Sequence, residues 1–260
     1  MKRIAASFVL AALCLAPVST RADGGMWMPQ QMVDLAPRLK KLGFQGNAKA
    51  FSDLTGMPMG AVISLGGCSA SFVSKDGLII TNHHCVTGAL QYIATPERNA
   101  VKEGFLAQTL ADEAWAGPGS RAFVTVAVRE VTKDVLGKLP ADQTDLDRQL
   151  AIEKREKELT AACEKEGLRC RVASFFQGLR WFEIAQVELK DVRLVYAPPS
   201  SIGNYGGEID NWRWPRHTGD FAFYRAYVGK DGKPAAYDKS NVPFKPKHFL
   251  AVDPAGASPG

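Results

Sequence analysis

The sequence predicts a mainly β protein, an antiparallel β-barrel with helical insertions. Three observations carry this prediction: β-like runs outnumber helical segments, Asp-Gly turns follow two of these runs, and irregular connections join the rest. With 46% hydrophobic and 23% charged residues in 260, the chain has enough apolar side chains for a buried core. This composition excludes a mostly disordered, a collagen-like and a polytopic membrane protein.

Residues 1–22 have the features of a secretory signal peptide. Two basic residues precede a short apolar stretch, residues 4–16, and Ala22 is the small residue that a signal peptidase prefers. The apolar stretch is too short to span a bilayer, so no stable membrane anchor is expected. We expect cleavage near Ala22 and Asp23 and export to a bacterial periplasm.

Removal of this leader changes the charge of the chain. Three of the 32 basic residues and none of the 27 acidic residues lie in the leader, so the formal net charge falls from +5 to +2. No dense run of Lys and Arg with interleaved aromatic residues remains. Nucleic-acid binding is therefore not expected.

Four of the five cysteines remain after the leader: Cys68, Cys85, Cys163 and Cys170. An even number in an oxidising compartment favours two disulfides. Of the three pairings, the simplest joins neighbours, Cys68 with Cys85 and Cys163 with Cys170. The alternative is a zinc site, but no Cys-x-x-Cys or His-x-x-x-His spacing supports it, so no metal is expected.

The first elements of the mature chain are a predicted helix and a predicted hairpin. Apolar residues recur at helical spacing within residues 28–42, namely at Met32, Leu35, Leu39 and Leu42. Short β-like runs follow at residues 61–65 and 71–73. Asp76-Gly77 is a strong hairpin turn before a buried strand at residues 78–80.

The later elements are a long helix and further strands. Thr144 and Asp147 form a capping signature at the start of a helix over residues 144–166, and Gly167 is its stop. Strands are expected at residues 123–128, 182–189, 192–196 and 221–228. A turn-rich stretch is expected at residues 198–207.

A His-His pair follows the predicted strand at residues 78–80. From the residues alone, such a pair is more often structural than catalytic. A disulfide between Cys85 and Cys68 would hold the loop of His84, and a general base benefits from such fixed geometry. A Cys–His nucleophile pair is the alternative, although adjacent residues at the end of a strand point apart.

A second stretch, residues 200–221, gathers glycines, two tryptophans, acids, an amide and a histidine before a strand. Segments of this composition either bind a ligand or wrap a corner of the core. In the first interpretation Asp220 orients a histidine, as in a serine-hydrolase triad. In the second interpretation Asp220 caps the strand entrance and the tryptophans anchor an Ω-loop.

Four motifs together resemble the bacterial S46 family of serine dipeptidyl-peptidases, types 7 and 11. They are Asp-Gly-Gly-Met-Trp at 23–27, Thr-Asn-His-His-Cys at 81–85, Ala-Pro-Pro-Ser-Ser-Ile-Gly at 197–203, and Asp-Asn-Trp-Arg-Trp-Pro-Arg-His-Thr-Gly-Asp-Phe at 210–221. The resemblance implies a chymotrypsin-like double β-barrel with helical insertions, incomplete in this chain. It implies no cofactor, and it allows a homodimer of the full-length enzyme.

The resemblance also implies roles for four residues. His84 would be the general base, and Asp220 would orient it. Asn211 and Trp212 would bind the free amino terminus of a peptide substrate, because an amide oxygen accepts from an ammonium group and an indole offers an aromatic surface. Three further histidines are expected to serve only packing or the surface: His83, His217 and His248.

The nucleophile is where this sequence departs from the family. The family's serine lies in a Gly-Asn-Ser-Gly-type motif in a much longer chain, and no Gly-x-Ser-Gly occurs in these 260 residues. The last residues, 253–260, have a turn or linker composition directly after an apolar run, 249–252. We therefore expect residues 23–260 to be the amino-terminal part of the peptidase domain, without nucleophile or helical insertion, and inactive alone.

The resemblance implies that the full-length protein is a serine-type exopeptidase that releases dipeptides from the free amino terminus of oligopeptides. Two alternatives stay open. One is an exported, non-catalytic peptide-binding module that keeps the clamp without the chemistry. The other is an endopeptidase, which would need the wall formed by Asn211 and Trp212 to be open.

Overall fold

The computed structural model describes residues 27–256 with the exception of 138, 141 and 166. The expected signal peptide, residues 1–22, lies outside these residues. Within the described part of the chain, no helix combines the length and the apolar character that crossing a membrane requires.

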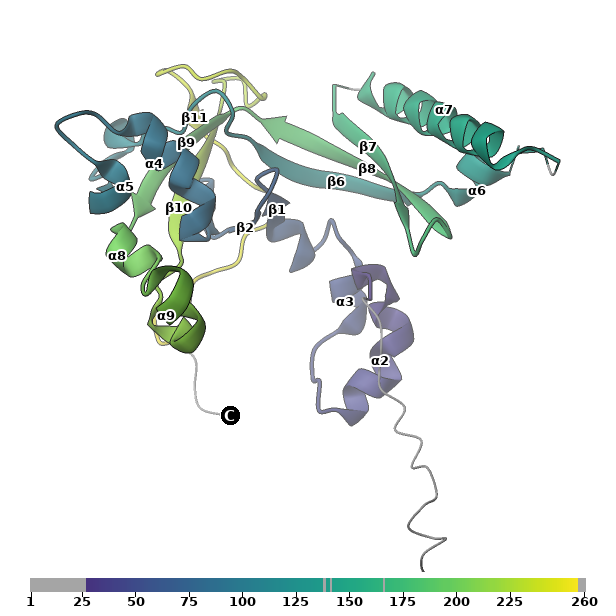
Figure 1. The fold of residues 1–260 in the computed structure, drawn as a ribbon, viewed down its shortest axis with the longest axis horizontal. Helices are drawn as coiled ribbons and strands as arrows, with labels where there is room; N and C mark the ends of the chain where they lie inside the picture. The colour runs from purple at the N-terminus through teal and green to yellow at the C-terminus, as the bar shows by residue number, and fades with distance from the viewer. Residues whose placement is uncertain (1–26, 138, 141, 166, 257–260) are drawn as a thin grey trace, which may run out of the picture.

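One antiparallel sheet of 11 strands organises the chain (Figure 1). Its main path runs β4-β9-β10-β3-β2-β1-β6-β8-β7, while β11 pairs with β10 and β5 pairs with β9. The strands are β1 (Val62–Ser64), β2 (Ser69–Phe72), β3 (Leu78–Thr81), β4 (Phe105–Leu106), β5 (Ala114–Trp115), β6 (Ala122–Glu130), β7 (Arg169–Phe175), β8 (Arg180–Leu189), β9 (Asp191–Ala197), β10 (Ala222–Val228) and β11 (Val242–Pro243).

Helices occupy the connections between these strands. The α-helices are α2 (Met32–Lys41), α3 (Ala48–Ser52), α4 (Thr87–Ile93), α5 (Ala100–Glu103), α6 (Thr132–Leu136), α7 (Asp145–Glu164), α8 (Ser200–Gly203) and α9 (Gly207–Arg213). The 3-10 helices are η1 (Pro29–Gln31), η2 (Met59–Ala61), η3 (His83–Val86), η4 (Leu110–Asp112) and η5 (Pro215–His217). The predicted mainly β fold with helical insertions is therefore confirmed.

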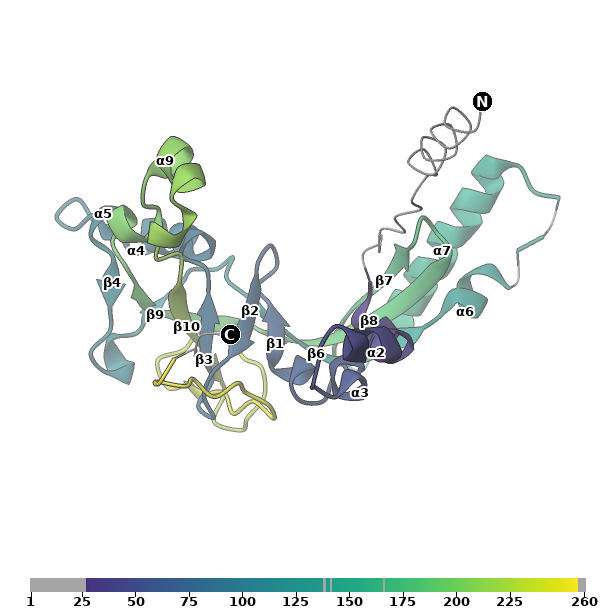
Figure 2. The same cartoon turned by 90° about the horizontal axis from the view of Figure 1, so that it is seen from below.

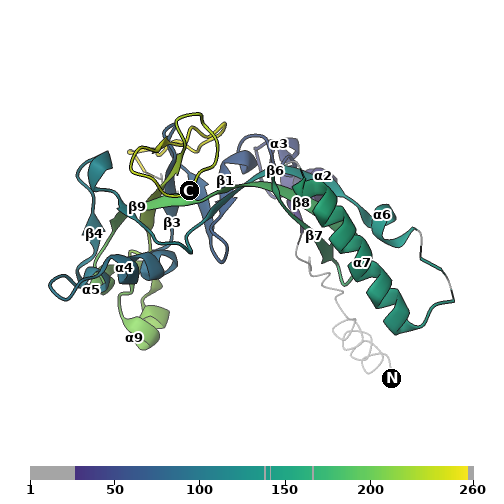
Figure 3. The same cartoon turned by 90° about the horizontal axis from the view of Figure 1, so that it is seen from above.

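The sheet does not close into a barrel within the described residues, consistent with the expectation of a double β-barrel that is incomplete in this chain. The terminal strands of the main path, β4 and β7, each pair on one side only. Strands β6 and β8 are the longest of the sheet, with 9 and 10 residues. These two strands run on beyond β1 and carry β7 and α7 away from β4 (Figures 1 and 3).

Two hydrophobic cores stabilise the two ends of the sheet. The larger core lies among β2, β3, β9, β10 and α4, where Phe72, Ile79 and Leu194 are fully buried. The smaller core lies under α7 and contains four buried residues, Val131, Val135, Ile152 and Trp181. The indole Nε1 of Trp181 also donates to Oε1 of Glu156 at 2.7 Å, which fastens α7 to β8.

A buried charged cluster fixes the connection between β10 and β11. The guanidinium of Arg193 donates to Asp191 at 3.0 and 2.8 Å and to the carbonyl of Asp238 at 2.8 Å. Asn241 donates to the same Asp191 carboxylate at 2.9 Å. The side chains of Asp191 and Arg193 are only 0% and 8% exposed, so this pair is shielded from water.

The β2–β3 hairpin forms as predicted and delivers the chain to the candidate site. Gly77 takes a φ of 72°, and a Cβ on it would lie 2.7 Å from the carbonyl oxygen of Phe244. Only glycine fits this turn without strain. The apolar run 249–252 forms no strand in the described part of the chain, although the Leu250 N–H donates to the carbonyl of Phe72 at 2.9 Å.

Candidate active site

Sheet register brings His84 and Asp220 together across 136 residues of sequence. His84 lies on η3, directly after β3, and Asp220 lies two residues before β10. Strands β3 and β10 are antiparallel neighbours in which Thr81 faces Ala222. The end of one strand therefore lies beside the start of the other, where the two side chains meet.

Two hydrogen bonds join His84 to Asp220. The ring Nδ1 of His84 lies 2.9 Å from Oδ2 of Asp220, and the His84 backbone N–H donates to Oδ1 at 3.1 Å. An ionised carboxylate only accepts hydrogen bonds, so Nδ1 carries the proton and the neutral ring keeps Nε2 free to accept one. The His84 side chain is 69% exposed, which leaves this nitrogen accessible.

Asp220 is held in its ionised form. Burial by itself raises the pKa of this carboxyl group. Hydrogen bonds from the backbone and ring of His84, with a further bond from Asn82, outweigh burial and keep the pKa below its ordinary value. Asp220 is thus a charged acceptor that fixes the tautomer and orientation of the imidazole.

Asn82 completes this arrangement, and sequence reasoning assigned it no role. Its Nδ2 donates to the backbone carbonyl of Asp220 at 3.2 Å and to Oδ2 at 3.1 Å. The only available signal was its position in the motif at residues 81–85. A lone asparagine after a strand does not reveal a partner 138 residues away.

His83 and His84 are neighbours on η3 but differ in exposure. His83 is only 4% exposed and packs against Gly203 of α8, where an added Cβ would clash with the His83 ring. Burial lowers the pKa of His83, while the charge of Asp220 and a hydrogen bond to the backbone of Pro198 oppose this effect. His83 is therefore a buried histidine that joins η3 to α8.

Asn211 and Trp212 lie on α9, which follows α8. Helix α8 lies beside α5 at one end of the sheet, and α9 extends beyond it (Figure 2). The stretch interpreted as an Ω-loop with tryptophan anchors is instead largely helical, and Trp212 and Trp214 are 85% and 58% exposed. The tryptophans therefore do not anchor this segment to the core, and the indole of Trp212 is presented to solvent.

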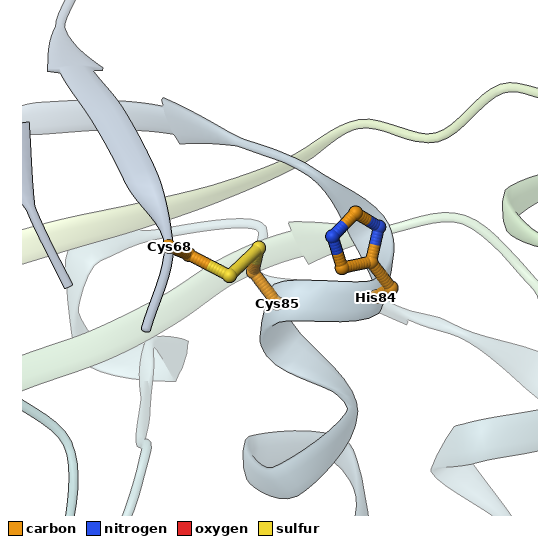
Figure 4. Close-up of side chains that lie close together, drawn as sticks. All are labelled: Cys68, His84 and Cys85. Atoms are coloured by element: carbon orange, nitrogen blue, oxygen red, sulfur yellow. A yellow bond between two sulfur atoms is a disulfide. The ribbon is translucent and has the colours of Figure 1, made fainter. Parts of the chain in front are cut away.

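The four cysteines form two disulfides, joined as neighbours. Cys68–Cys85 links the start of β2 to η3, and Cys163–Cys170 links the end of α7 to β7. The first bridge lies directly beside the His84 ring (Figure 4). It holds η3 against the β1–β2 connection and limits the movement of His84.

Sequence comparison identifies the family of this chain. The Peptidase S46 profile matches residues 22–260, which is most of the chain. The chain belongs to the peptidase S46 family.

Curated S46 relatives are named dipeptidyl-peptidases. An Asp/Glu-specific dipeptidyl-peptidase of Shewanella putrefaciens is 49% identical over 253 residues, which cover 97% of this chain and 34% of the relative. Dipeptidyl-peptidase 7 of Capnocytophaga gingivalis is 38% identical over 259 residues, covering 97% of this chain and 36% of the relative. The S46 chain thus spans about a third of the length of the curated relatives it matches.

Solved S46 structures share its fold. DPP11 of Porphyromonas endodontalis in complex with substrate matches with a TM-score of 0.79 at 35% identity, over 91% of this chain and 36% of that chain. The same enzyme in complex with the dipeptide Arg-Asp matches with a TM-score of 0.80 at 36% identity, over 91% and 35% of the two chains.

Proposed function

We propose that this chain carries the general base and the orienting carboxylate of a serine-type exopeptidase that releases dipeptides from the free amino terminus of oligopeptides. The observation that carries the proposal is the His84–Asp220 pair, with Nδ1 at 2.9 Å from the carboxylate and Nε2 open to solvent. The S46 relatives named dipeptidyl-peptidases support the same reaction class.

In the proposed mechanism His84 accepts the proton of the nucleophilic serine through Nε2. The proton then passes to the leaving amine of the substrate. Asp220 stays ionised and stabilises the imidazolium that forms between these two transfers, because its pKa is already depressed by the bonds from His84 and Asn82. The serine itself is proposed to come from outside these 260 residues, because no Gly-x-Ser-Gly occurs in them.

The substrate clamp is proposed to be formed by Trp212 and Asn211 of α9; the side chain of Asn211 lies outside the part of the chain that the structure describes. Trp212 offers an indole that is 85% exposed and suited to stack against the first residue of a peptide. Asn211 lies next to it in the chain and is proposed to accept from the terminal ammonium group. The relative at 49% identity is named Asp/Glu-specific, so an acidic residue before the scissile bond is the first substrate to test.

A chimera with the S. putrefaciens relative tests the catalytic pair. Residues 23–260 replace the matching segment of that enzyme, and release of dipeptides from peptides with free amino termini is measured. We expect activity in the chimera, a fall in kcat of about 10⁴-fold for Asp220→Asn, and at least that for His84→Ala. Asp231→Asn, in an exposed turn, and His217→Ala, another exposed histidine, serve as controls.

A folded chimera that releases no dipeptide, or one that keeps its activity after His84→Ala, would overturn the proposal.

The clamp is tested in the same chimera with Trp212→Ala. We expect this substitution to raise KM for free peptides, whereas Trp27→Ala, at another exposed tryptophan outside α9, leaves KM unchanged. Equal hydrolysis of acetylated and free peptides would instead identify an endopeptidase, and peptide binding without hydrolysis would identify the binding module.

A further inference from the structure

Three potential metal ligands meet at the catalytic histidine. The Sγ atoms of Cys68 and Cys85 and a ring nitrogen of His84 all lie within 4.8 Å of one another. Figure 4 shows the His84 ring beside the disulfide, with one ring nitrogen on the side of the sulfur atoms. Two sulfurs and one imidazole are a ligand set that Zn²⁺ prefers.

In the oxidised protein the two sulfur atoms are bonded to each other. The metal ligand in proteins is the thiolate, and a disulfide supplies none. Reduction of the bridge would turn both cysteines into potential thiolate ligands beside His84. A dithiol transfers two electrons and two protons to the bridge and becomes a disulfide itself, while Cys68 and Cys85 become thiols. A phosphine supplies the two electrons and becomes a phosphine oxide, while one water molecule supplies its oxygen and the two thiol protons.

The spacing of the three ligands suits a tetrahedral ion. With Zn–S distances of about 2.3 Å and a Zn–N distance of about 2.0 Å, ligand atoms of a tetrahedral site lie roughly 3.5–3.8 Å apart. The three atoms in this structure already lie within 4.8 Å of one another. Once the sulfur atoms are no longer bonded to each other, the three ligand atoms start close to these distances.

The surroundings of His84 also suit a metal ligand. Histidines that bind zinc commonly donate their other ring N–H to a carboxylate, which fixes the ring and raises its basicity. Asp220 already accepts from Nδ1 at 2.9 Å, and Nε2 is left to coordinate. Because the His84 side chain is 69% exposed, water can fill the fourth position.

We propose that, once a dithiol or a phosphine reduces the Cys68–Cys85 disulfide, Cys68, Cys85 and Nε2 of His84 bind one thiophilic divalent metal ion such as Zn²⁺. Binding displaces the two thiol protons. The intact disulfide thereby keeps such ions away from Nε2 of His84, the nitrogen proposed to accept the serine proton. This consequence alone rests on the proposed function. The metal site itself is tested without any measurement of peptidase activity.

The test uses Co²⁺ as the probe and the purified chain carrying Cys14→Ser, Cys163→Ser and Cys170→Ser, so that only Cys68 and Cys85 supply thiols. After reduction with a phosphine, we expect one Co²⁺ per chain, a thiolate-to-cobalt charge-transfer band and the visible bands of a tetrahedral ion. The oxidised chain should show none of these. Cys68→Ser and Cys85→Ser should each remove the charge-transfer band or weaken binding by at least tenfold.

Two histidine and two aspartate variants decide whether the folded site binds the ion. His84→Ala should weaken Co²⁺ binding at least tenfold, and Asp220→Asn should weaken it about 10–100-fold through the lost bond to Nδ1. His217→Ala and Asp231→Asn should leave it unchanged. A reduced chain that binds no Co²⁺, or that binds it equally in all four variants because it has unfolded, would overturn the proposal.

Discussion

At the scale of single residues, His83 makes the stability of the protein depend on pH. Burial lowers its pKa below the ordinary 6.5, so the unfolded chain takes up a proton before the folded chain does. Stability contributed by neutral His83 is complete above pH 6.5 and is lost as the pH falls toward the lowered pKa. The charged groups that face it are Asp220, which opposes this shift, and His84, which adds to it.

We expect His83→Asn to remove part of this dependence. Urea unfolding between pH 5 and pH 7.5 measures it, and the wild-type free energy of unfolding should fall toward the acidic end more steeply than that of the variant. His217→Asn, at an exposed position, should behave like the wild type. Identical pH profiles for the wild type and His83→Asn would contradict this account.

Gly203 is a second residue with a predicted effect. A methyl group at this position would overlap the His83 ring, which is buried and has little room to move. We expect Gly203→Ala to lower the free energy of unfolding by about 1–3 kcal/mol and to displace α8. Gly119→Ala is the matched control, because nothing lies within 4 Å of a Cβ there. Equal stability of the two variants in thermal unfolding would show that the contact is loose.

The site illustrates what residue patterns can and cannot predict. The family motifs identified His84 and Asp220 as candidates, but the residues alone favoured a structural role for the histidine pair. Their contact depends on the register between β3 and β10, which brings together residues 136 apart in sequence. Asn82 stayed unassigned for the same reason, since its partner is visible only in three dimensions.

At the scale of elements, the buried Asp191–Arg193 pair fixes the loop between β10 and β11 to β9. Removal of one partner leaves a charge without compensation in a dry environment. We expect Asp191→Ala to cost about 3–5 kcal/mol of unfolding free energy in chemical denaturation. Glu158→Ala breaks an exposed ion pair with Arg155 and should cost less than about 1 kcal/mol. A similar cost for both would mean that the buried pair is solvated.

Helices and strands with a clear hydrophobic or capping pattern were predicted from the sequence. Those whose sequence mixes apolar residues with charged residues, glycine or proline were not. The apolar runs at β3 and β9 and the capped helix α7 match expectation. Edge strand β7 was missed because charged and polar residues alternate with its few apolar ones. Helices α8 and α9 were missed because their glycines and the preceding prolines resemble a turn-rich loop.

At the scale of the whole molecule, the two cores differ in size, and their stability should differ accordingly. The core around β3, β9 and β10 is extensive, whereas the core under α7 has four buried residues. We expect backbone amides in β3, β9 and β10 to exchange with deuterium more slowly than those in β7 and α7. Hydrogen exchange followed by mass spectrometry measures this difference, and uniform protection across the sheet would contradict it.

The pairing of β3 with β10 also determines when His84 and Asp220 can meet during synthesis of the chain. The ribosome produces His84 long before Asp220, because 136 residues separate the two. Until β10 has emerged and joined the sheet, the imidazole has no carboxylate to fix its tautomer. A nascent chain therefore carries His84 before the carboxylate that fixes the orientation of its ring has been synthesised.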